Sequence, residues 1–408
     1  MANVVIIGGG AAGCFCAAIL SELHPGWPVS VLEAGPRLMA KLSVTGGGRC
    51  NLTNSFAALC PDSHADLKRV SVKTLEQVYP RGAALMKRAL SSFSQWDCCK
   101  WFEDHGVELV VQDDRCVFPR SQDAMQIVRT LERQMRLGGV RIRCRHKVSN
   151  IGADLLIMPG ELKPDAVVLT TGGGTAGILR DTGIELVPPV PSLFTFKVGD
   201  ESLRALMGTV VEDAALSIAG TRFHSRGTLL LTDWGVSGPA TLRLSSYAAR
   251  YLAENQYKAT LLINWLNCSE SEASAWLEAM SGGARLIANC HHPLLSDRLW
   301  RHLLGRAGIR NDCRWSELGS KGRSRLISVL TADSYPLTGR AAFKEEFVTC
   351  GGVALSEVDP SSMQSRKVPG LYFAGEVLDI DAVTGGFNLQ AAWSTAWVAA
   401  HAISQSLS

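Results

Sequence analysis

Short apolar runs bounded by glycine divide the start of the chain into a strand, a helix and a second strand. Residues 3–7 form a mostly apolar run that ends at a glycine-rich turn, as is typical of a buried parallel strand. The alanine-rich residues 11–23 predict a helix, and residues 29–33 predict the second strand. A strand–helix–strand unit of about 30 residues is characteristic of one half of a nucleotide-binding domain.

The pattern continues as a mixed α/β sequence up to a proline-rich boundary. Residues 70–110 have a mostly helical pattern, whereas residues 140–150 and 165–171 predict strands. Three prolines between positions 188 and 191 then interrupt the pattern. We interpret this interruption as the end of the first segment of the domain.

A different pattern follows the prolines, and the first pattern returns near the C-terminus. Residues 192–265 carry short strand-like runs, and residues 270–330 have a helical pattern. Residues 371–374 then predict another buried strand, and residues 388–404 an alanine-rich helix. The sequence therefore predicts an insertion between the two ends of one domain.

Composition limits the class of protein without naming a partner. A chain of 408 residues is expected to form two or three domains, and 46% hydrophobic with 19% charged residues is a globular balance. No apolar run reaches the roughly 18 residues of a membrane span, and the N-terminus lacks the basic start of a signal peptide. The twelve cysteines form no C-x-x-C pair, so we expect no metal site and a cytoplasmic location.

The turn after the first strand matches the dinucleotide-binding pattern G-x-G-x-x-G. Gly8 permits the tight turn, Gly10 lets the backbone approach a pyrophosphate, and Gly13 lets helix and strand pack closely. The helix start, with Ala11 and Ala12, offers free N–H groups to the phosphates. The predicted contacts at the end of the second strand are Glu33, which would accept hydrogen bonds from ribose hydroxyls, and Ala34.

The C-terminal strand favours FAD over NAD as the dinucleotide. It ends in Gly375 and Glu376, which can place an acid against a ribityl chain. The helix that begins near Asn388 can direct its positive end at a flavin ring and stabilise the reduced pyrimidine portion. Contacts in this region are predicted from Gly375, Glu376, Asp379, Gly385, Gly386, Phe387 and Asn388, with Asp381 as a further ligand of ribityl or flavin polar groups.

The glycine-rich loop 41–54 is the first candidate for chemistry. Lys41 could approach N5 of the flavin, and Arg49 could hold a phosphate or a substrate anion. We favour cofactor contact over the alternative, in which the loop only shapes the cleft and both cations are solvated. Predicted contacts are Lys41, Thr45, Gly46, Gly47, Gly48, Arg49, Cys50 and Asn51, together with Thr171, Gly172 and Gly173 after the strand at 165–171.

Lys41 and Cys50 are the candidate catalytic residues. Reduction of a C=C bond needs a general acid that protonates the second carbon, and Arg49 beside Cys50 could lower the pKa of that thiol. The alternative for Cys50 is a small buried thiol behind the glycine loop, and we favour it.

The chain resembles the YhiN/BaiN-like family of FAD-dependent flavoproteins, also known as the aminoacetone-oxidase-like family. The resemblance covers nearly the whole chain and is carried by five segments, which are residues 41–54, 115–119, 237–239, 351–353 and 370–388. It implies an α/β fold with a Rossmann-like FAD-binding domain from both termini (1–187 and 345–408), an inserted β-rich domain (188–268 and 331–344) and a small helical domain (269–330).

The resemblance implies a flavin reductase or oxidase, and three hypotheses about the function remain open. We favour a reductase of an activated C=C bond, driven by NAD(P)H; the specific version reduces uridine to dihydrouridine in 23S rRNA. The alternatives are an oxidase of a small amine and a non-catalytic flavin-binding protein that docks on RNA. RNA contact is predicted from a basic stretch that contains Arg298, Arg301, Arg306, Arg310 and Arg314, although such a run is more often a solvated helical face. Exposed Trp300 and Trp315 would support base stacking there.

Two positions depart from the family pattern. The segment after Gly174 is shorter than the usual glycine- and serine-rich loop, and Asp233 occupies the place of a histidine. Any contact or chemistry that the loop or the histidine provides in other members is therefore absent or replaced in this chain.

Overall fold

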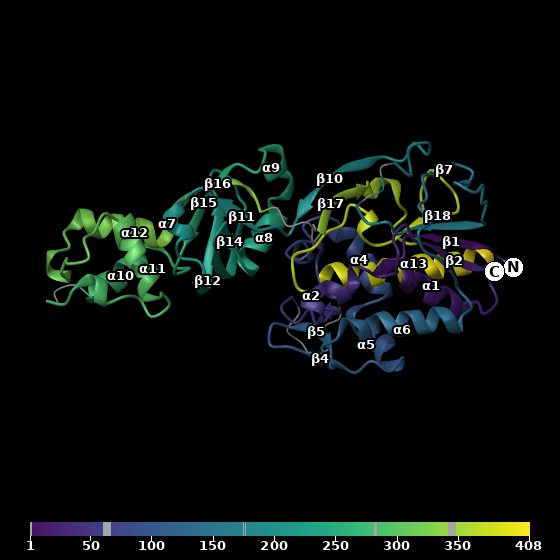
Figure 1. Cartoon of the computed structure of the whole chain (residues 1–408), viewed down its shortest axis with the longest axis horizontal. Coiled ribbons are helices and arrows are strands. Elements are labelled where there is room, and N and C mark those ends of the chain that lie inside the picture. The colour runs from purple at the N-terminus through teal and green to yellow at the C-terminus, as the bar shows by residue number, and fades with distance from the viewer. Residues whose placement is uncertain (1, 60–66, 174, 176, 281–283, 342–347) are drawn as a thin grey trace. The chain divides into compact units, whose positions relative to one another are not determined.

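The computed structural model describes residues 2–59, 67–173, 175, 177–280, 284–341 and 348–408. The chain forms two compact units. Unit 1 contains Met1–Val190 and Val348–Ser408, and unit 2 contains Pro191–Phe347. Unit 1 is thus built from both ends of the chain, with unit 2 inserted between them (Figure 1).

A parallel sheet of five described strands, in the order β18-β9-β1-β2-β6, forms the centre of unit 1. The four residues of the central strand β1 are at most 3% exposed, since both faces of the sheet are covered. The chain adds β2 and β6 on one side of β1 and then β9 and β18 on the other, so the strand order reverses between β1 and β9. The strands are β1 Val4–Ile7, β2 Val29–Leu32, β6 Arg141–Arg143, β9 Ala166–Leu169 and β18 Leu371–Phe373.

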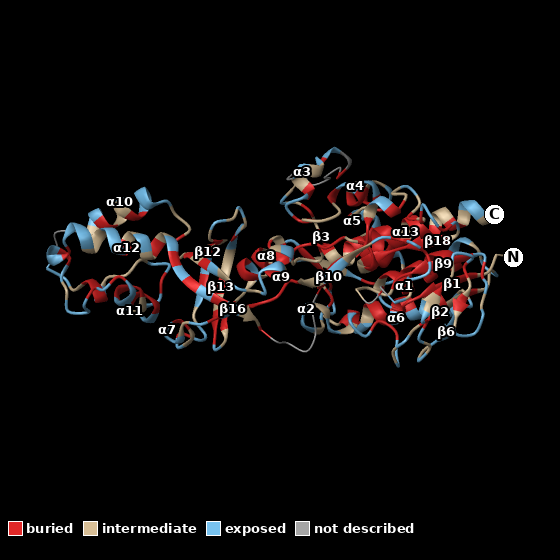
Figure 2. Ribbon diagram, turned by 90° about the horizontal axis from the view of Figure 1, so that it is seen from above, coloured by how far each residue is buried: buried red, intermediate tan, exposed pale blue. Residues whose placement is uncertain are grey.

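The longest helix, α13 (Phe387–Leu407), lies in the interior of unit 1 and contacts α1 (Ala11–Leu23), α4 and α5. Both α13 and α1 are largely buried (Figure 2). The ring of Phe15 on α1 lies 5.3 Å from that of Trp393 on α13. The other helices are α2 Thr45–Gly48, α3 Val72–Leu75, α4 Ala83–Ser92, α5 Gln95–Asp104 and α6 Ala124–Leu137, with short 3-10 turns η1 Leu42–Val44, η2 Leu67–Arg69, η5 Leu355–Glu357 and η6 Gly375–Val377.

Three small sheets complete unit 1 and lead into unit 2. Their orders are β3-β5-β4, β7-β8 and β10-β17. The last of these pairs the strand that leaves unit 1 with the strand that returns to it. The strands are β3 Thr53–Asn54, β4 Leu109–Val111, β5 Cys116–Pro119, β7 Asn150–Ile151, β8 Ile157–Met158, β10 Leu186–Ser192 and β17 Val348–Val353.

Unit 2 is a closed antiparallel barrel with a helical segment between its last two strands. The barrel order is β11-β14-β13-β12-β15-β16. The strands are β11 Phe196–Val198, β12 Val210–Ile218, β13 His224–Thr232, β14 Gly235–Ser237, β15 Ala259–Asn264 and β16 Asp333–Arg340. The helices are α7 Glu201–Arg204, α8 Pro239–Tyr247, α9 Ala249–Glu254, α10 Glu270–Met280, α11 Asp297–Arg306 and α12 Ser320–Ala332, with η3 Ile287–Asn289 and η4 Trp315–Glu317.

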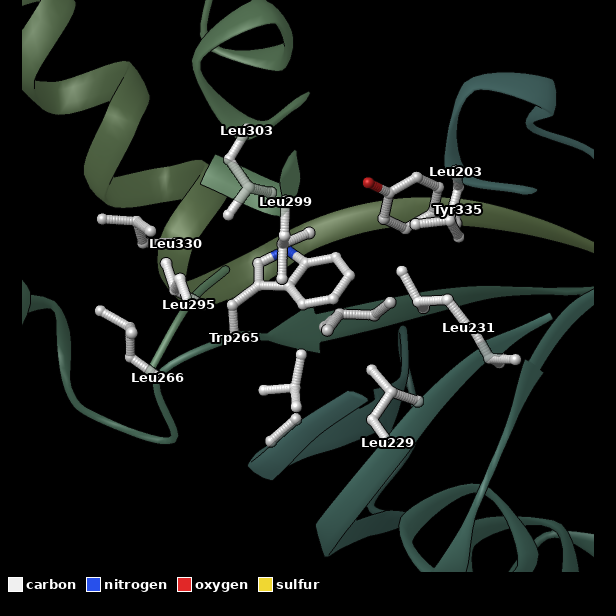
Figure 3. Close-up of a cluster of buried hydrophobic side chains, with 14 of the residues drawn as sticks. Leu203, Leu229, Leu231, Trp265, Leu266, Leu295, Leu299, Leu303, Leu330 and Tyr335 are labelled. Carbon is white, nitrogen blue, oxygen red and sulfur yellow. The ribbon is translucent and has the colours of Figure 1, made fainter. Parts of the chain in front are cut away.

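The barrel and the helical segment share one hydrophobic core. Trp265 is fully buried where the two meet, with Leu231 of the barrel on one side and Leu299 and Leu330 of the helices on the other (Figure 3). The indole N–H of Trp265 donates to Asp333 at 3.2 Å. The helices therefore complete the barrel core, and the boundary predicted at 268/269 between two inserted domains remains a prediction.

The parallel sheet and its covering helices confirm the predicted α/β fold class. The strand predicted at 140–150 is shorter than expected, because only β6 (Arg141–Arg143) and the first residue of β7 (Asn150–Ile151) lie within that range. In the described part of the chain, no helix combines the length and the apolar character that crossing a membrane requires.

Candidate active site

The glycine-rich turn after β1 lies at the point where the strand order reverses. Gly8 has a φ of 108°, and a Cβ there would lie 2.5 Å from the carbonyl oxygen of Thr170, at the end of β9. A Cβ on Gly13 would overlap the carbonyl oxygen of Gly8. By contrast, a Cβ on Gly10 would meet no described atom within 4 Å. Protein atoms therefore fill the space beside Gly8 and Gly13, whereas no described atom fills the space beside Gly10.

The N-terminus of α1 is available to an anion. Gly10 is its N-cap, no described side chain caps the helix, and its first turn carries no acid. The backbone N–H groups at the start of a helix have no intrahelical partner and carry a partial positive charge. An uncapped helix start beside an open glycine is the geometry that accommodates a pyrophosphate.

Glu33 lies directly after β2, next to this turn. Its carboxylate accepts hydrogen bonds from the backbone N–H of Gly9 and of Gly35, both at 2.6 Å. These bonds fix the half-buried carboxylate at the edge of the site while leaving acceptor capacity on both oxygens. The arrangement suits two ribose hydroxyls. Ala34 is exposed beside it.

The C-terminal segment lies against the start of α1. Gly375 has a φ of 76°, and a Cβ there would lie 2.9 Å from the Cβ of Ala12 on α1. Glu376 accepts the backbone N–H of Thr349 at 2.7 Å through Oε1, and its Oε2 lies 3.8 Å from Nζ of Lys41. The structure thus brings Lys41 to Glu376, and Ala12 to the adjacent Gly375, from distant parts of the sequence.

The loop after β9 joins the same cluster. A Cβ on Gly172 would lie 3.4 Å from Oε2 of Glu376, and a Cβ on Gly173 would overlap the side chain of Thr349. The hydroxyl of Thr171 lies 3.0 Å from that of Thr175. Gly172 therefore faces Glu376 and Gly173 faces Thr349, while position 174 lies outside the described residues.

The loop 41–54 contains a left-handed glycine turn. Gly46, Gly47 and Gly48 have φ values of 59°, 70° and 83°. A Cβ on Gly47 or Gly48 would meet no described atom within 4 Å, so this side of the loop is not covered by the described protein atoms. The hydroxyl of Thr45 donates to the carbonyl of Leu42 at 2.8 Å. The open glycines can receive a ligand at close range.

Arg49 and Cys50 differ from the prediction in their surroundings. The guanidinium of Arg49 lies 4.6 Å from the centre of the Phe118 ring, and Nε donates to Gly46 at 3.1 Å. Cys50 is fully buried. Burial raises the pKa of the Cys50 thiol to about 12, partly offset by a hydrogen bond with Thr45. The expected lowering of the Cys50 pKa by Arg49 is wrong, because desolvation dominates; the favoured alternative, a small buried thiol, describes its position.

The N-terminus of α13 is held by the strand β3. Gly386, the N-cap, has a φ of 86°, and a Cβ there would overlap the carbonyl oxygen of Thr53. The amide of Asn54 donates to Gly385 at 3.0 Å. With its amide oriented to satisfy both contacts, Asn51 accepts the N–H of Gly386 at 3.2 Å. The start of α13, which no described side chain caps, is thereby fixed beside loop 41–54.

Phe387 and Asn388 have structural contacts of their own. The ring of Phe387 packs edge-on against Phe56 with centroids 5.0 Å apart, and its carbonyl accepts the hydroxyl of Tyr79 at 2.9 Å. The side chain of Asn388 bonds both the N–H and the carbonyl of Ala382, at 2.9 and 3.0 Å. Asn388 therefore closes the loop before α13.

The two aspartates of the C-terminal segment differ. Asp381 is fully buried and forms a two-oxygen ion pair with Arg81, so the expected role of Asp381 as a cofactor ligand is wrong. Asp379 is half-buried, and its backbone N–H donates to Val353 at 3.0 Å. In unit 2, Asp233 is an exposed residue of the turn between β13 and β14.

Sequence reasoning missed three residues that shape the site. The hydroxyl of Thr170 donates to the carbonyls of Ile7 and Gly8 at 3.0 and 2.7 Å, which ties β9 to the glycine turn. Thr349 orients Glu376. Arg81 neutralises Asp381. The position of Thr170 at the end of an apolar run could have indicated its role. Nothing in the sequence around Thr349 or Arg81 indicates theirs.

The arginines predicted to contact RNA are engaged within unit 2. Arg306 pairs with the buried Asp333 at 2.7 Å and lies over the ring of Tyr335, so it is a structural residue. Trp300 and Trp315 are at most 2% exposed, so the expectation of exposed aromatics is wrong, because both fill the shared core. The remaining partners are Asp297 for Arg301, Asp312 for Arg310, the carbonyls of Ala205 and Met207 for Arg298, and the carbonyl of Ala284 for Arg314.

The residues of unit 1 fit FAD. Two uncapped helix starts, the open glycines at 10, 47 and 48, and the fixed carboxylates of Glu33 and Glu376 border one region at the carboxyl ends of the parallel strands. Ligands of open α/β sheets bind at this edge. In the described residues, no group of three or more His, Cys, Asp or Glu side chains is placed to hold a metal ion. The fold and site define a Rossmann-type, FAD-dependent oxidoreductase.

Sequence comparison agrees with this class. The chain belongs to the HI0933-like family, because the profile described as "HI0933-like protein Rossmann domain" matches residues 2–402. The resemblance inferred from the motifs is therefore confirmed.

Two curated relatives span almost the whole chain. The "Ribosomal RNA dihydrouridine synthase" of Escherichia coli (strain K12) is 30% identical over 416 residues, which cover 98% of this chain and 97% of that protein. The "3-dehydro-bile acid delta(4,6)-reductase" of Clostridium scindens is 26% identical over 99% of this chain and 100% of that protein. Among solved structures, the 3-ketosteroid delta1-dehydrogenase from Sterolibacterium denitrificans has a TM-score of 0.53 at 11% identity, with 99% of each chain covered. That likeness supports the fold alone.

Proposed function

We propose that this chain is an NAD(P)H-driven, FAD-dependent reductase that converts uridine to dihydrouridine in 23S rRNA. The similarity to the E. coli rRNA dihydrouridine synthase over nearly the full length of both chains carries this proposal. The name of the C. scindens relative also describes reduction of carbon–carbon double bonds. Both kinds of substrate contain a double bond conjugated to a carbonyl group, so one flavin site suits both.

When bound, FAD would supply hydride chemistry between a nicotinamide and one carbon of the substrate double bond, and the other carbon would take its proton from water. The start of α1 and Gly10 would hold the pyrophosphate, and Glu33 the ribose hydroxyls. The uncapped start of α13 would stabilise negative charge on the pyrimidine part of the flavin. Each of these roles requires a free N–H group or an acceptor that the fold holds in place.

We assign to Lys41 the polarisation of the substrate carbonyl. Its side chain is 74% exposed, and its ammonium group lies 3.8 Å from the carboxylate of Glu376, which keeps the charge near the site. An ammonium that donates to the carbonyl oxygen stabilises the charge that develops there as hydride arrives. The buried Cys50, with its raised pKa of about 12, is a poor proton donor at neutral pH.

An anaerobic absorbance titration tests the reductase half-reaction. NADH or NADPH is expected to bleach the flavin bands of the purified holoprotein. Bands that persist with both nicotinamides, but bleach with small amines, would replace the reductase with an amine oxidase. Bands that no donor bleaches would leave a flavin-binding protein without this activity.

A genetic experiment tests the substrate. Deletion of the gene is expected to remove a dihydrouridine from 23S rRNA, and a plasmid copy should restore it. A Lys41→Met copy should restore much less than Lys41→Arg, which retains the positive charge. The substrate assignment is abandoned if every rRNA dihydrouridine survives the deletion.

A further inference from the structure

A cluster of exposed positive charge lies in unit 1, at the outer strand of the parallel sheet. Between positions 129 and 147 the chain carries seven Lys and Arg residues against one acid, Glu132. Five of these cations follow one another at the end of α6 and along β6. We call them the β6 edge; they are Arg136, Arg141, Arg143, Arg145 and Lys147, and all five are exposed.

No member of the β6 edge has an acidic partner among the residues that the structure describes. The arginines of the helical segment in unit 2 differ, since Arg301, Arg306 and Arg310 are each paired with an aspartate. Exposed cations without partners retain their full attraction for a polyanion, whereas paired cations must first give up a partner.

The geometry of β6 presents these cations outward. Among the described strands, β6 pairs only with β2 and is the last strand of the sheet (Figure 2). Side chains alternate along a strand, so Arg141 and Arg143 share one face of the sheet. Arg145 follows in the turn. The guanidinium groups are therefore displayed as a row, and each can form a forked pair with a phosphate.

The β6 edge is attached directly to the candidate FAD site. The backbone N–H of Glu33 donates to Arg143 at 2.9 Å, and that of His146 donates to Glu33 at 2.8 Å. The N–H of Arg145 donates to Gly35 at 2.8 Å. A polyanion bound along this edge thus lies next to the adenosine end of the site, on the same rigid sheet.

We infer that the β6 edge is the surface on which this protein binds the phosphate backbone of its RNA substrate. The inference rests on the proposed function and moves the RNA contact from the helical segment of unit 2 to the sheet edge of unit 1. Exposed Leu137, at 73%, lies between Arg136 and Arg141 in sequence and can contact sugars or bases. An anionic membrane is the less suitable occupant, because the apolar face of α6 (Ile127, Val128, Leu131, Met135) is buried in the fold.

Two charge-matched triple variants of the FAD-loaded full chain test the inference. The first is Arg141→Gln, Arg143→Gln and Arg145→Gln, and the second is Arg301→Gln, Arg310→Gln and Arg314→Gln in unit 2. Arg145 has a φ of 55°, so glutamine, another side chain with a Cβ, adds no new backbone strain there. Binding to a 23S rRNA fragment is measured by fluorescence anisotropy over a range of salt concentrations.

The β6-edge variant is expected to bind roughly 10- to 100-fold more weakly, with the slope of log K against log salt reduced by about 2 to 3. The unit 2 variant should bind like the unsubstituted protein. Both should retain the FAD spectrum and the same rate of flavin reduction by NAD(P)H, which shows that the site is intact.

Other outcomes separate the two proposals. If the unsubstituted protein does not bind the fragment, the proposed function itself fails. If it binds, and the β6-edge variant binds equally well or the unit 2 variant loses binding, only the surface assignment is overturned. Loss of binding to phosphatidylglycerol vesicles, or a raised KM for NADPH, with RNA binding unchanged, would likewise overturn it in favour of a membrane or a nicotinamide phosphate.

Discussion

The guanidinium of Arg81 holds the carboxylate of Asp381 through both oxygens, with Nε 2.5 Å from Oδ1. The side chain of Asp381 is fully buried, and that of Arg81 is 12% exposed. The pair joins the loop before α4 to the segment before α13, 300 residues apart in sequence. It therefore fixes the segment that carries the N-cap Gly386 of α13.

Asp381→Asn is expected to lower the free energy of unfolding by about 3 kcal/mol, because it leaves a poorly exposed guanidinium without its anion. FAD affinity should fall with it. Urea unfolding and flavin fluorescence measure the two effects. The control Lys100→Gln removes an exposed ion pair of the same unit and should cost less than about 1 kcal/mol. Equal losses in the two variants would contradict the structural role of the buried pair.

The space beside Gly10 is open to the cofactor, whereas the space beside Gly13 is filled by the protein backbone. Gly13→Ala should prevent folding or strongly destabilise unit 1, since its Cβ would overlap the carbonyl of Gly8. Gly10→Ala should keep the melting temperature of the apoprotein within a few degrees, because its Cβ meets no described atom, while weakening FAD binding by roughly tenfold or more. Calorimetry and flavin titration distinguish the two. FAD binding that is unaffected in Gly10→Ala would place the pyrophosphate elsewhere.

Because the thiols of Cys16 and Cys50 are buried, the free energy of unfolding should fall at alkaline pH. Burial raises the pKa values of Cys16 and Cys50 from 9.0 to about 12. Above pH 9 the unfolded thiols ionise and the folded ones do not. Stability present below pH 9 is therefore lost as the pH rises toward 12, by about 1.4 kcal/mol per pH unit for each thiol. Urea unfolding at pH 8, 9 and 10 should show a shallower decline for the double variant Cys16→Ala, Cys50→Ala. Parallel declines would show that these thiols do not contribute.

Tyr335 connects the helical segment of unit 2 to its barrel. Its hydroxyl donates to Asp333 at 2.5 Å and accepts from Nε2 of His302 on α11 at 3.0 Å. Tyr335→Phe leaves both partners short of a bond and should lower the free energy of unfolding of unit 2 by about 1–3 kcal/mol. Tyr251→Phe, whose hydroxyl has no partner among the described residues, is the matched control and should have little effect. Thermal unfolding followed by near-UV circular dichroism compares them, and a Tyr335→Phe curve that superimposes on the control would exclude this connection.

Local sequence signals predicted the elements around the glycine turn. The run 3–7, the turn at Gly8 and the acid at Glu33 lie within one βαβ unit, so their spacing alone placed them together. Sequence also indicated that both ends of the chain belong to one domain. These features depend on short-range periodicity and on glycine conformations that few other residues adopt.

Contacts between distant segments could not be predicted in this way. Nothing near Asp381 indicates that Arg81 neutralises it, and nothing near Arg49 indicates that it lies over Phe118. The pattern of residues 285–325 showed its arginines but not the distant Asp333 that pairs with Arg306, and not the burial of Trp300. Charge and burial depend on tertiary neighbours, which periodicity does not specify.

The pairing of β10 with β17 places the exit and return of the chain side by side, and β11 and β16 pair within the barrel. The ends of unit 2 therefore meet, and joining them in the folded state requires little loop closure. The two junctions of unit 2 are therefore neighbours in the fold, although they lie far apart in the sequence. Replacement of the whole inserted unit would therefore leave the strand order of the flavin-binding scaffold unchanged.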